Sequence, residues 1–174
     1  NKLLKARKKS NKKNVKIKFD KIYKLLKKRT NLRNKIVGGY YPVNYEIDDL
    51  NILNKFEKKK IAIALPSIKK NYKMNFIKCS LNVPFVLNQY GIPEPSSGTV
   101  VNPDILLVPL VAFDKNLNRL GYGGGYYDRL IEKLEKKKKF LKIGLAIWQQ
   151  EIQNVPTSTY DKKLDFIVTD KYIL

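Results

Sequence analysis

The chain has 174 residues, 43% of them hydrophobic, which is enough for an α/β domain with a buried core. It contains no histidine and one cysteine, so Ser-His-Asp and Cys-His nucleophile systems and Cys/His zinc sites are excluded. Any catalysis must use carboxylates, Lys or Arg, Tyr, backbone dipoles or a hard metal ion. Cys79 cannot form an internal disulfide, so we expect a reducing, cytoplasmic compartment. The chain begins with Asn1, which leaves open whether a targeting segment precedes it.

The net charge of +21 is unevenly distributed. Residues 1–39 hold 16 Lys and Arg against one acid, a net +15, whereas the remainder holds 20 against 14. A nucleic-acid partner would explain this surplus. A general bias toward lysine, with solvated side chains, would explain it equally simply, and we favour the bias. No apolar run approaches the roughly 18 residues that a membrane-spanning helix needs.

Apolar residues recur at helical spacing in two segments, which predicts amphipathic helices with inward faces at Val15, Phe19, Ile22 and Leu26, and at Ile47, Leu50, Leu53 and Phe56. Residues 46–49 would open the second helix, because the helix dipole favours acids in the first turn. A third helix is expected from Tyr126 to about Lys137. Apolar or alternating runs predict strands at 36–37, 61–65 (closed by Pro66), 74–80, 105–108, 141–147 and 165–169. The segments 91–98 and 149–160 are expected to be irregular.

Strands that alternate with helices indicate a three-layer α/β sandwich, with a mostly parallel central sheet flanked by helices. We see no repeat and no linker, so we expect a single domain over residues 1–174. In such sheets ligands bind beyond the carboxyl ends of the strands. Glu46, the 91–98 loop, the glycines after residue 120 and Asp161 all follow strand candidates and are expected to converge on one cleft.

Four glycines lie ahead of the third predicted helix, at Gly121, Gly123, Gly124 and Gly125, shortly after Arg119. Backbone N–H groups of glycines can approach an anion closely, and a helix N-terminus adds positive charge there. This pattern favours a phosphate cradle. It is neither a Walker loop, which needs Gly-Lys followed by Ser or Thr, nor a dinucleotide fingerprint, which needs glycine where Tyr126 stands. The alternative is a glycine-rich turn that only reverses the chain.

The stretch Pro109, Ala112-Phe113-Asp114 and Arg119 through Asp128 (RLGYGGGYYD) closely resembles the signature of the 5-formyltetrahydrofolate cyclo-ligase family, also called methenyltetrahydrofolate synthetases. The similarity covers most of the chain. It extends to Tyr40-Tyr41-Pro42 with Glu46-Ile47-Asp48, Pro66 with Met74-Asn75-Phe76, Gly91 to Pro95, and Asp161 to Asp165.

This resemblance implies an ATP-driven ligase that closes 5-formyltetrahydrofolate to 5,10-methenyltetrahydrofolate and releases ADP and phosphate. The formyl oxygen would attack the γ-phosphate to give an imidate phosphate, and N10 would then attack the formyl carbon. The implied ligands are ATP, Mg²⁺ and the folate, whose glutamate or polyglutamate tail would suit lysines near the cleft mouth. We expect a monomer with no membrane or nucleic-acid partner.

The family's site residues are carried over position by position. ATP binding falls to Arg119, Leu120, Gly121, Tyr122, Gly123, Gly124, Gly125, Tyr126 and Tyr127. Substrate binding falls to Tyr41, Glu46, Met74, Tyr122 and Tyr126, with Phe76 as a further apolar wall. Asp128 and Asp161 would hold Mg²⁺, and Arg119, Tyr126 and Asp128 would be catalytic. From position alone, Glu46 and Asp128 could instead favour helix N-termini, Asp161 could be a turn residue, and Met74 and Phe76 could be core.

The chain departs from the family pattern in places. Tyr122 provides less phosphate-directed charge than a basic residue would, and Tyr160 stands where members often have histidine. The family has a Lys-x-x-Leu-Arg motif that helps bind ATP, and residues 2–10 resemble the segment just after that motif. We therefore expect the motif to lie upstream of Asn1, and its absence would weaken nucleotide binding.

Two other functions compete with the ligase. An RNA-binding or adaptor protein on the same scaffold would use the basic N-terminal segment, but we would then expect aromatic residues interleaved among its lysines. Residues 1–39 contain only Phe19 and Tyr23 as aromatics. A sugar-phosphate isomerase or acyl-transfer enzyme would not require Glu46, Asp128 and Asp161 together. We therefore favour the ligase.

Overall fold

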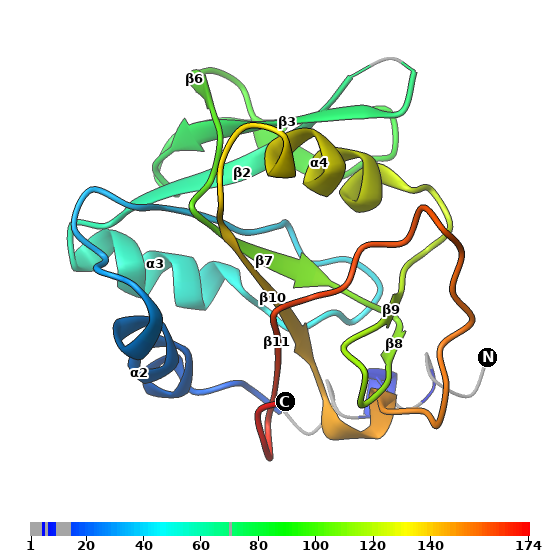
Figure 1. The fold of residues 1–174 in the computed structure, drawn as a ribbon. Helices are drawn as coiled ribbons and strands as arrows, with labels where there is room; N and C mark the ends of the chain where they lie inside the picture. The colour runs from blue at the N-terminus through cyan, green and yellow to red at the C-terminus, as the bar shows by residue number, and fades with distance from the viewer. Residues whose placement is uncertain (1–4, 6, 10–14, 70) are drawn as a thin grey trace.

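The computed structural model describes residues 5, 7–9, 15–69 and 71–174. Its main sheet has seven strands in the order β11-β10-β7-β1-β2-β3-β6 (Figure 1). Their bounds are β1 (Ile36–Gly38), β2 (Ala62–Lys69), β3 (Lys73–Cys79), β6 (Thr99–Val101), β7 (Ile105–Pro109), β10 (Leu141–Ala146) and β11 (Phe166–Thr169). The pairings from β11 through β2 are parallel, whereas β3 pairs antiparallel with β2 and β6. The predicted mostly parallel sheet is confirmed.

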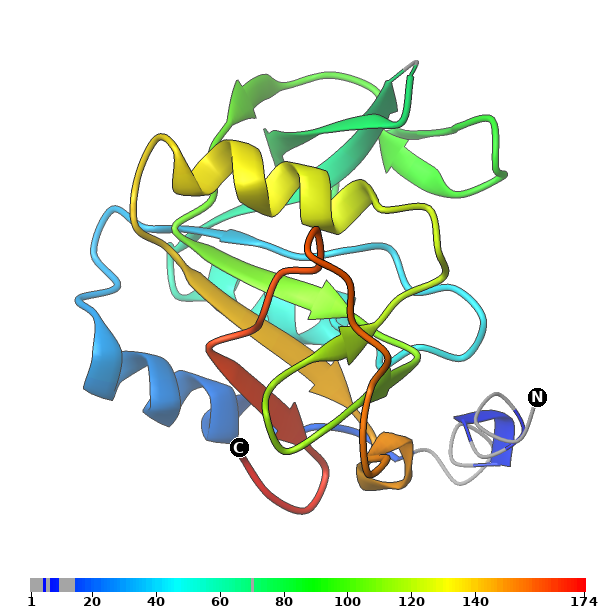
Figure 2. The ribbon, with the colours of Figure 1, turned by 45° about the vertical axis from the view of Figure 1, so that its right-hand side comes forward.

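Helices cover both faces of this sheet, as the two views show (Figure 1, Figure 2). α2 (Phe19–Arg29) and α3 (Leu50–Lys58) lie on one face, and α4 (Tyr126–Glu135) lies on the other. Alternate residues of β7 supply the two cores: Ile105 and Leu107 pack with α2 and α3, while Leu106 and Val108 pack with α4. The three-layer arrangement is therefore confirmed. In the described part of the chain, no helix is long and apolar enough to cross a membrane.

The first two helices begin later than predicted. α2 starts at Phe19 rather than Val15, although Phe19, Ile22 and Leu26 are buried as expected. α3 starts at Leu50, so residues 46–49 precede the helix and do not form its first turn. The chain reverses at Asn44 and Tyr45, whose φ angles of 48° and 62° are left-handed. The buried Asp49 carboxylate then accepts a hydrogen bond from the Tyr40 backbone N–H at 2.8 Å.

Pro66 does not end its strand, because β2 continues to Lys69 and pairs with β3 throughout. On the side of β2 that faces β1, the parallel pairing stops at Ala64. Beyond Ala64 there is no β1 carbonyl to accept a hydrogen bond, so the missing N–H of Pro66 breaks no sheet hydrogen bond. The N–H of Ile68, which points the same way, donates instead to the Glu94 carboxylate at 2.9 Å. Proline is tolerated where a strand has lost its neighbour.

Two small hairpins are not predicted by the sequence. β4 (Phe85–Leu87) pairs with β5 (Pro93–Pro95), which lies inside the expected 91–98 loop. β8 (Ala112–Phe113) pairs with β9 (Arg119–Leu120). Arg119 therefore lies on a strand rather than in a loop. Both ladders are two or three residues long, and β5 contains two prolines, so their sequences resemble loops. The short helix η1 (Trp148–Gln150) overlaps the start of the expected irregular segment 149–160. The other predicted ends are within about two residues of those observed.

Candidate functional site

A cavity of about 500 Å³ opens at the carboxyl ends of the parallel strands. The glycine loop (residues 121–125) forms one wall, the β1–α3 segment a second, and the β4–β5 hairpin a third. Glu46, Ile92, Gly121–Gly125 and Asp161 all line it, so the segments expected to converge do meet. We call this space the tyrosine cavity, because its lining includes Tyr40, Tyr41, Tyr72, Tyr90, Tyr122, Tyr126 and Tyr127.

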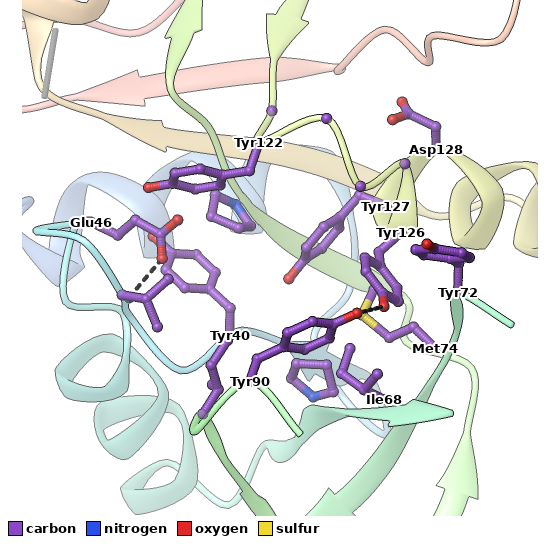
Figure 3. Close-up of a pocket in the computed structure, with 18 of the residues that line it drawn as sticks. Tyr40, Glu46, Ile68, Tyr72, Met74, Tyr90, Tyr122, Tyr126, Tyr127 and Asp128 are labelled. Carbon is purple, nitrogen blue, oxygen red and sulfur yellow. Dashed lines mark hydrogen bonds between the residues drawn. The ribbon is translucent and has the colours of Figure 1, made fainter. Parts of the chain in front are cut away.

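Figure 3 shows these rings around one space, with Tyr122 on the side of Glu46 and Tyr90 and Tyr126 opposite. The hydroxyl groups of Tyr90 and Tyr126 are 2.7 Å apart, which closes the wall between the β4–β5 hairpin and the start of α4. Met74 and Ile68 add apolar surface. Flat rings with polar tips and few charges suit a planar heterocyclic ligand with a polar edge.

The glycine loop joins β9 to α4 and requires glycine at two points. Gly123 and Gly125 have φ angles of 85° and 63°, a region that side chains with a Cβ rarely adopt. Gly125 is the N-cap of α4 and provides no side-chain cap. The first N–H groups of the helix therefore stay available at the cavity wall, where the helix dipole favours an anion.

Arg119 brings a cation to this anion-favouring region. Its side chain is largely buried, and Nη2 donates to Asp128 Oδ1 at 2.8 Å. Its Nε atom is buried and has no hydrogen-bond partner within the described residues. A buried donor without a partner costs free energy, so Arg119, which lines the cavity, is a candidate for ligand binding.

Asp128 and Asp161 both line the cavity. Asp128 Oδ1 also accepts from the Lys162 N–H at 3.1 Å, and Asp161 Oδ2 accepts from the Ser158 N–H at 2.6 Å. The described residues contain no cluster of three or more ligands that could hold a metal ion alone. Two carboxylates fit Mg²⁺ of the kind that arrives with a nucleotide, because this ion is usually bound by one or two carboxylates, phosphates and water.

Glu46 is the buried carboxylate at the far end of the cavity. Burial raises its pKa to about 7, against the opposing effects of the Val43 N–H, the Arg7 guanidinium and Tyr122. The Val43 N–H donates to Oε2 at 2.9 Å (Figure 3). Asp49, fully buried behind it, has its pKa raised well above the usual range, again chiefly by burial. The cavity therefore holds one carboxyl whose pKa lies near neutral pH, and the pKa of the neighbouring buried Asp49 is raised as well.

All the sequence-predicted site residues line the cavity except Phe76, which is core and packs against Gly38. Among the described lining residues there is no lysine, so lysines for a glutamate tail would have to lie outside the cavity. Sequence reasoning missed Tyr72, Tyr90 and Arg7. Tyr90 follows the β4 strand, which is too short to have a clear strand pattern, and Arg7 belongs to a lysine-rich stretch that offers no local signal.

Comparisons with known proteins agree with this geometry. The model of the 5-formyltetrahydrofolate cyclo-ligase family matches residues 1–170. The 5-formyltetrahydrofolate cyclo-ligase of Haemophilus influenzae is 36% identical over 138 residues, which cover 75% of this chain and 73% of that protein. The Mycoplasma genitalium cyclo-ligase is 34% identical over 135 residues, 74% of this chain and 68% of that one.

Two solved structures share the fold. The Aquifex aeolicus 5,10-methenyltetrahydrofolate synthetase superposes with a TM-score of 0.78 at 30% identity, covering 99% of this chain and 88% of that one. The Mycoplasma pneumoniae synthetase has a TM-score of 0.71 at 23% identity, covering 97% and 94%, and supports the fold alone. Because the family model covers nearly the whole chain and curated relatives above 30% identity match most of it, the chain belongs to the 5-formyltetrahydrofolate cyclo-ligase family of ATP-dependent ligases.

Proposed function

We propose that this chain converts 5-formyltetrahydrofolate to 5,10-methenyltetrahydrofolate in the tyrosine cavity, with ATP cleaved to ADP and phosphate. The observation that carries this assignment is that one cavity contains both a phosphate-type wall and an aromatic pocket ending in a carboxylate. A phosphoryl donor and a planar folate ring would therefore meet in the same space, as this reaction requires.

The phosphate end consists of Arg119 and the glycine loop with the first turn of α4. The guanidinium, with its unpartnered Nε, and the uncapped N–H groups of α4 would bind the phosphate oxygens of ATP. They also face the site where negative charge grows as the γ-phosphoryl group is transferred, which is how such steps are generally accelerated.

The folate end consists of the tyrosine rings and Glu46. Tyr41, Tyr122 and Tyr126 would stack against or border the pterin, and Met74 would contact its apolar face. The Glu46 carboxylate, once ionised, would accept hydrogen bonds from adjacent N–H groups of the ring. Its pKa of about 7 makes this interaction depend on pH in the neutral range.

The chemistry needs no covalent enzyme nucleophile. The formyl oxygen attacks the γ-phosphorus, the bond to ADP breaks, and an imidate phosphate forms. N10 then bonds to the formyl carbon and gives up its proton, and phosphate leaves with the former formyl oxygen. The protein orients both reactants and excludes water. Cys79 does not line the cavity, and burial raises the pKa of its thiol to about 11.

Asp128 and Asp161 would hold Mg²⁺ at the phosphate end. When bound, this ion neutralises phosphate charge and makes the γ-phosphorus more electrophilic. Asp128 would serve a second role, because its Oδ1 fixes the orientation of Arg119.

The test is formation of the methenyl product, followed by its absorbance, from 5-formyltetrahydrofolate with ATP and Mg²⁺. We expect turnover that requires ATP. Asp128→Asn keeps an acceptor oxygen for Arg119 but loses the charge, so we expect a loss of about 100-fold and a higher Mg²⁺ requirement. Asp20→Asn, an exposed change on α2, is the matched control and should leave the rate unchanged.

The outcomes separate the parts of the proposal. Absence of product from the unaltered protein, with ATP and the folate both bound, would contradict the assigned reaction. Full activity and an unchanged Mg²⁺ requirement in Asp128→Asn would leave the reaction in place and remove Asp128 from the metal site.

A further inference from the structure

One buried charge at the cavity is not explained by ATP or by folate binding. Arg7 lies in the N-terminal segment, where residues 7–9 are helical, and only 2% of its surface is exposed. It does not line the cavity itself. A fully buried guanidinium is costly unless its donors are satisfied, so its contacts indicate its role.

Arg7 donates to two different walls of the cavity. Nη1 donates to the Tyr122 hydroxyl of the glycine loop at 2.7 Å, and its carbon Cζ lies 5.8 Å from the centre of that ring. Nε and Nη2 donate to the carbonyls of Tyr45 and Val43 in the β1–α3 segment, at 3.3 and 3.2 Å. The guanidinium thus connects the Tyr122 side chain to the β1–α3 segment that carries Glu46.

Arg7 also faces the Glu46 carboxylate, with Nη2 3.9 Å from Oε1 and both side chains almost fully buried. The Val43 N–H and the Tyr122 hydroxyl also favour the ionised form of Glu46. The neighbouring Tyr40, Asp49 and Tyr127 feel the negative charge of Glu46. Every one of them is neutral or acidic. Arg7 is therefore the cation that favours the ionised form of Glu46 among these neighbours.

We propose that Arg7 is a positioning residue for the folate: its guanidinium favours the charged form of the Glu46 carboxyl against the effect of burial and holds Tyr122 beside it, so that both meet the pterin in one arrangement. This inference rests on the proposed function, in which Glu46 binds the pterin. It assigns a role at the folate end to a segment whose lysine-rich composition resembles a solvated tail. The phosphate end is held by Arg119 and should not depend on Arg7.

The test compares Arg7→Met, which keeps much of the side-chain volume, with Arg7→Lys and with Lys8→Met as a matched control. Lys8 is exposed and lies over the Tyr45 ring, with no hydrogen bond to Glu46 or Tyr122 in the described structure. For Arg7→Met we expect KM for the folate to rise at least about 30-fold, because one partner of a buried charge pair is lost. KM for ATP should change by less than about two-fold.

A second readout does not depend on turnover. Carbon NMR of the Glu46 carboxyl, without ligands, should show its titration midpoint rising by about one pH unit in Arg7→Met. Arg7→Lys keeps the charge, so its Glu46 midpoint should lie close to that of the unaltered protein. Its folate KM should be only partly restored, because an ammonium group lacks the planar set of N–H donors with which the guanidinium binds Tyr122. Lys8→Met should change neither quantity.

These measurements distinguish a positioning role of Arg7 from a merely structural one. Equal rises in the two KM values, or an unmoved Glu46 midpoint, would show that Arg7 is merely structural and would overturn the inference. If the unaltered protein makes no product, the proposed reaction fails. The NMR titration would still show whether Arg7 controls the charge of Glu46.

Discussion

Two concave regions of similar size in the described part of the chain lie at opposite ends of the strands of the main sheet. The tyrosine cavity, about 500 Å³, follows the carboxyl ends of β1, β2 and β7. A second hollow, about 440 Å³, precedes β1 and β2 and is lined by residues 30–34 and 59–61 with Tyr23 and Lys27. We call the second region the basic hollow, because Lys27, Arg33, Lys59 and Lys60 line it.

The two regions differ in how their charges are held. In the tyrosine cavity, Arg119 and Asp128 form an ion pair, and Glu46 is buried beside Arg7. In the basic hollow, the four cations are exposed and make no ion pair within the described part of the chain. They lie at or just beyond the C-terminal ends of α2 and α3. The helix dipole favours cations at these positions, so their presence does not require a bound ligand. The candidate functional site therefore differs from the basic hollow in the burial of its charged side chains, and not in its size or in the presence of charge.

The largest expected effect contrasts one arginine from each region. Arg119→Ala removes a buried cation and leaves the Asp128 carboxylate without its partner, so we expect kcat/KM for ATP to fall roughly 1,000-fold. Arg33→Ala, in the basic hollow, should leave kcat/KM within about two-fold. Steady-state kinetics measures both, with thermal unfolding to confirm that each variant folds. Similar losses of kcat/KM in Arg119→Ala and Arg33→Ala would show that the tyrosine cavity and the basic hollow do not differ in function.

Local sequence patterns are sufficient to predict the central elements. The strand predicted from the apolar run at Ile105–Val108 and the helix predicted from Tyr126 both appear where expected. Burial of a strand on both faces leaves a continuous apolar run in the sequence. The meeting of distant loops is predicted by the rule that ligands bind at the carboxyl edge of a parallel sheet. These predictions need no knowledge of side-chain contacts.

The errors come from contacts between segments far apart in the chain and from unusual backbone angles. The acids at residues 46–49 suggest a helix start, but the chain makes a turn just before them, with left-handed φ angles at Asn44 and Tyr45. The sequence of these two residues does not indicate that turn, so the helix is predicted to begin too early. Met74 and Phe76 share one face of β3, but only the register shows that Met74 reaches the cavity while Phe76 stays beneath it. Arg7 donates a hydrogen bond to Tyr122, which is 115 residues away in the chain. A contact over that separation leaves no local pattern of apolar and polar residues in the sequence.

The next expected effect is on stability and distinguishes a buried carboxyl from exposed charge. Because the Glu46 pKa rises from 4.5 to about 7 on folding, the folded protein binds its proton more tightly. Ionisation of Glu46 therefore lowers stability as pH rises from 4.5 to 7, by up to about 3 kcal/mol. Glu46→Gln remains neutral, so it should gain about that much relative to the unaltered protein at pH 8 and nothing near pH 4.

Urea unfolding at these two pH values measures the difference. The amide oxygen introduced by Glu46→Gln can still accept from the Val43 N–H, so the backbone hydrogen bond is preserved. Lys60→Gln, an exposed change in the basic hollow, should alter the free energy of unfolding by less than about 0.5 kcal/mol at either pH. A stability change for Glu46→Gln that is the same at both pH values would show that Glu46 titrates as an exposed glutamate does.

The smallest expected effect concerns the basic hollow itself. We expect Lys27→Gln, Lys59→Gln and Lys60→Gln together to keep kcat/KM within about two-fold. Their combined effect on the affinity for single-stranded RNA should equal that of three exposed lysines near the end of α4, Lys136, Lys137 and Lys139, because non-specific binding depends on the number of charges and not on their place. Titrations at several salt concentrations make this comparison. If the hollow variant lost far more RNA affinity than the α4 variant, the exposed cations of the basic hollow would form an RNA-binding site. Burial would then no longer distinguish a functional region from a non-functional one.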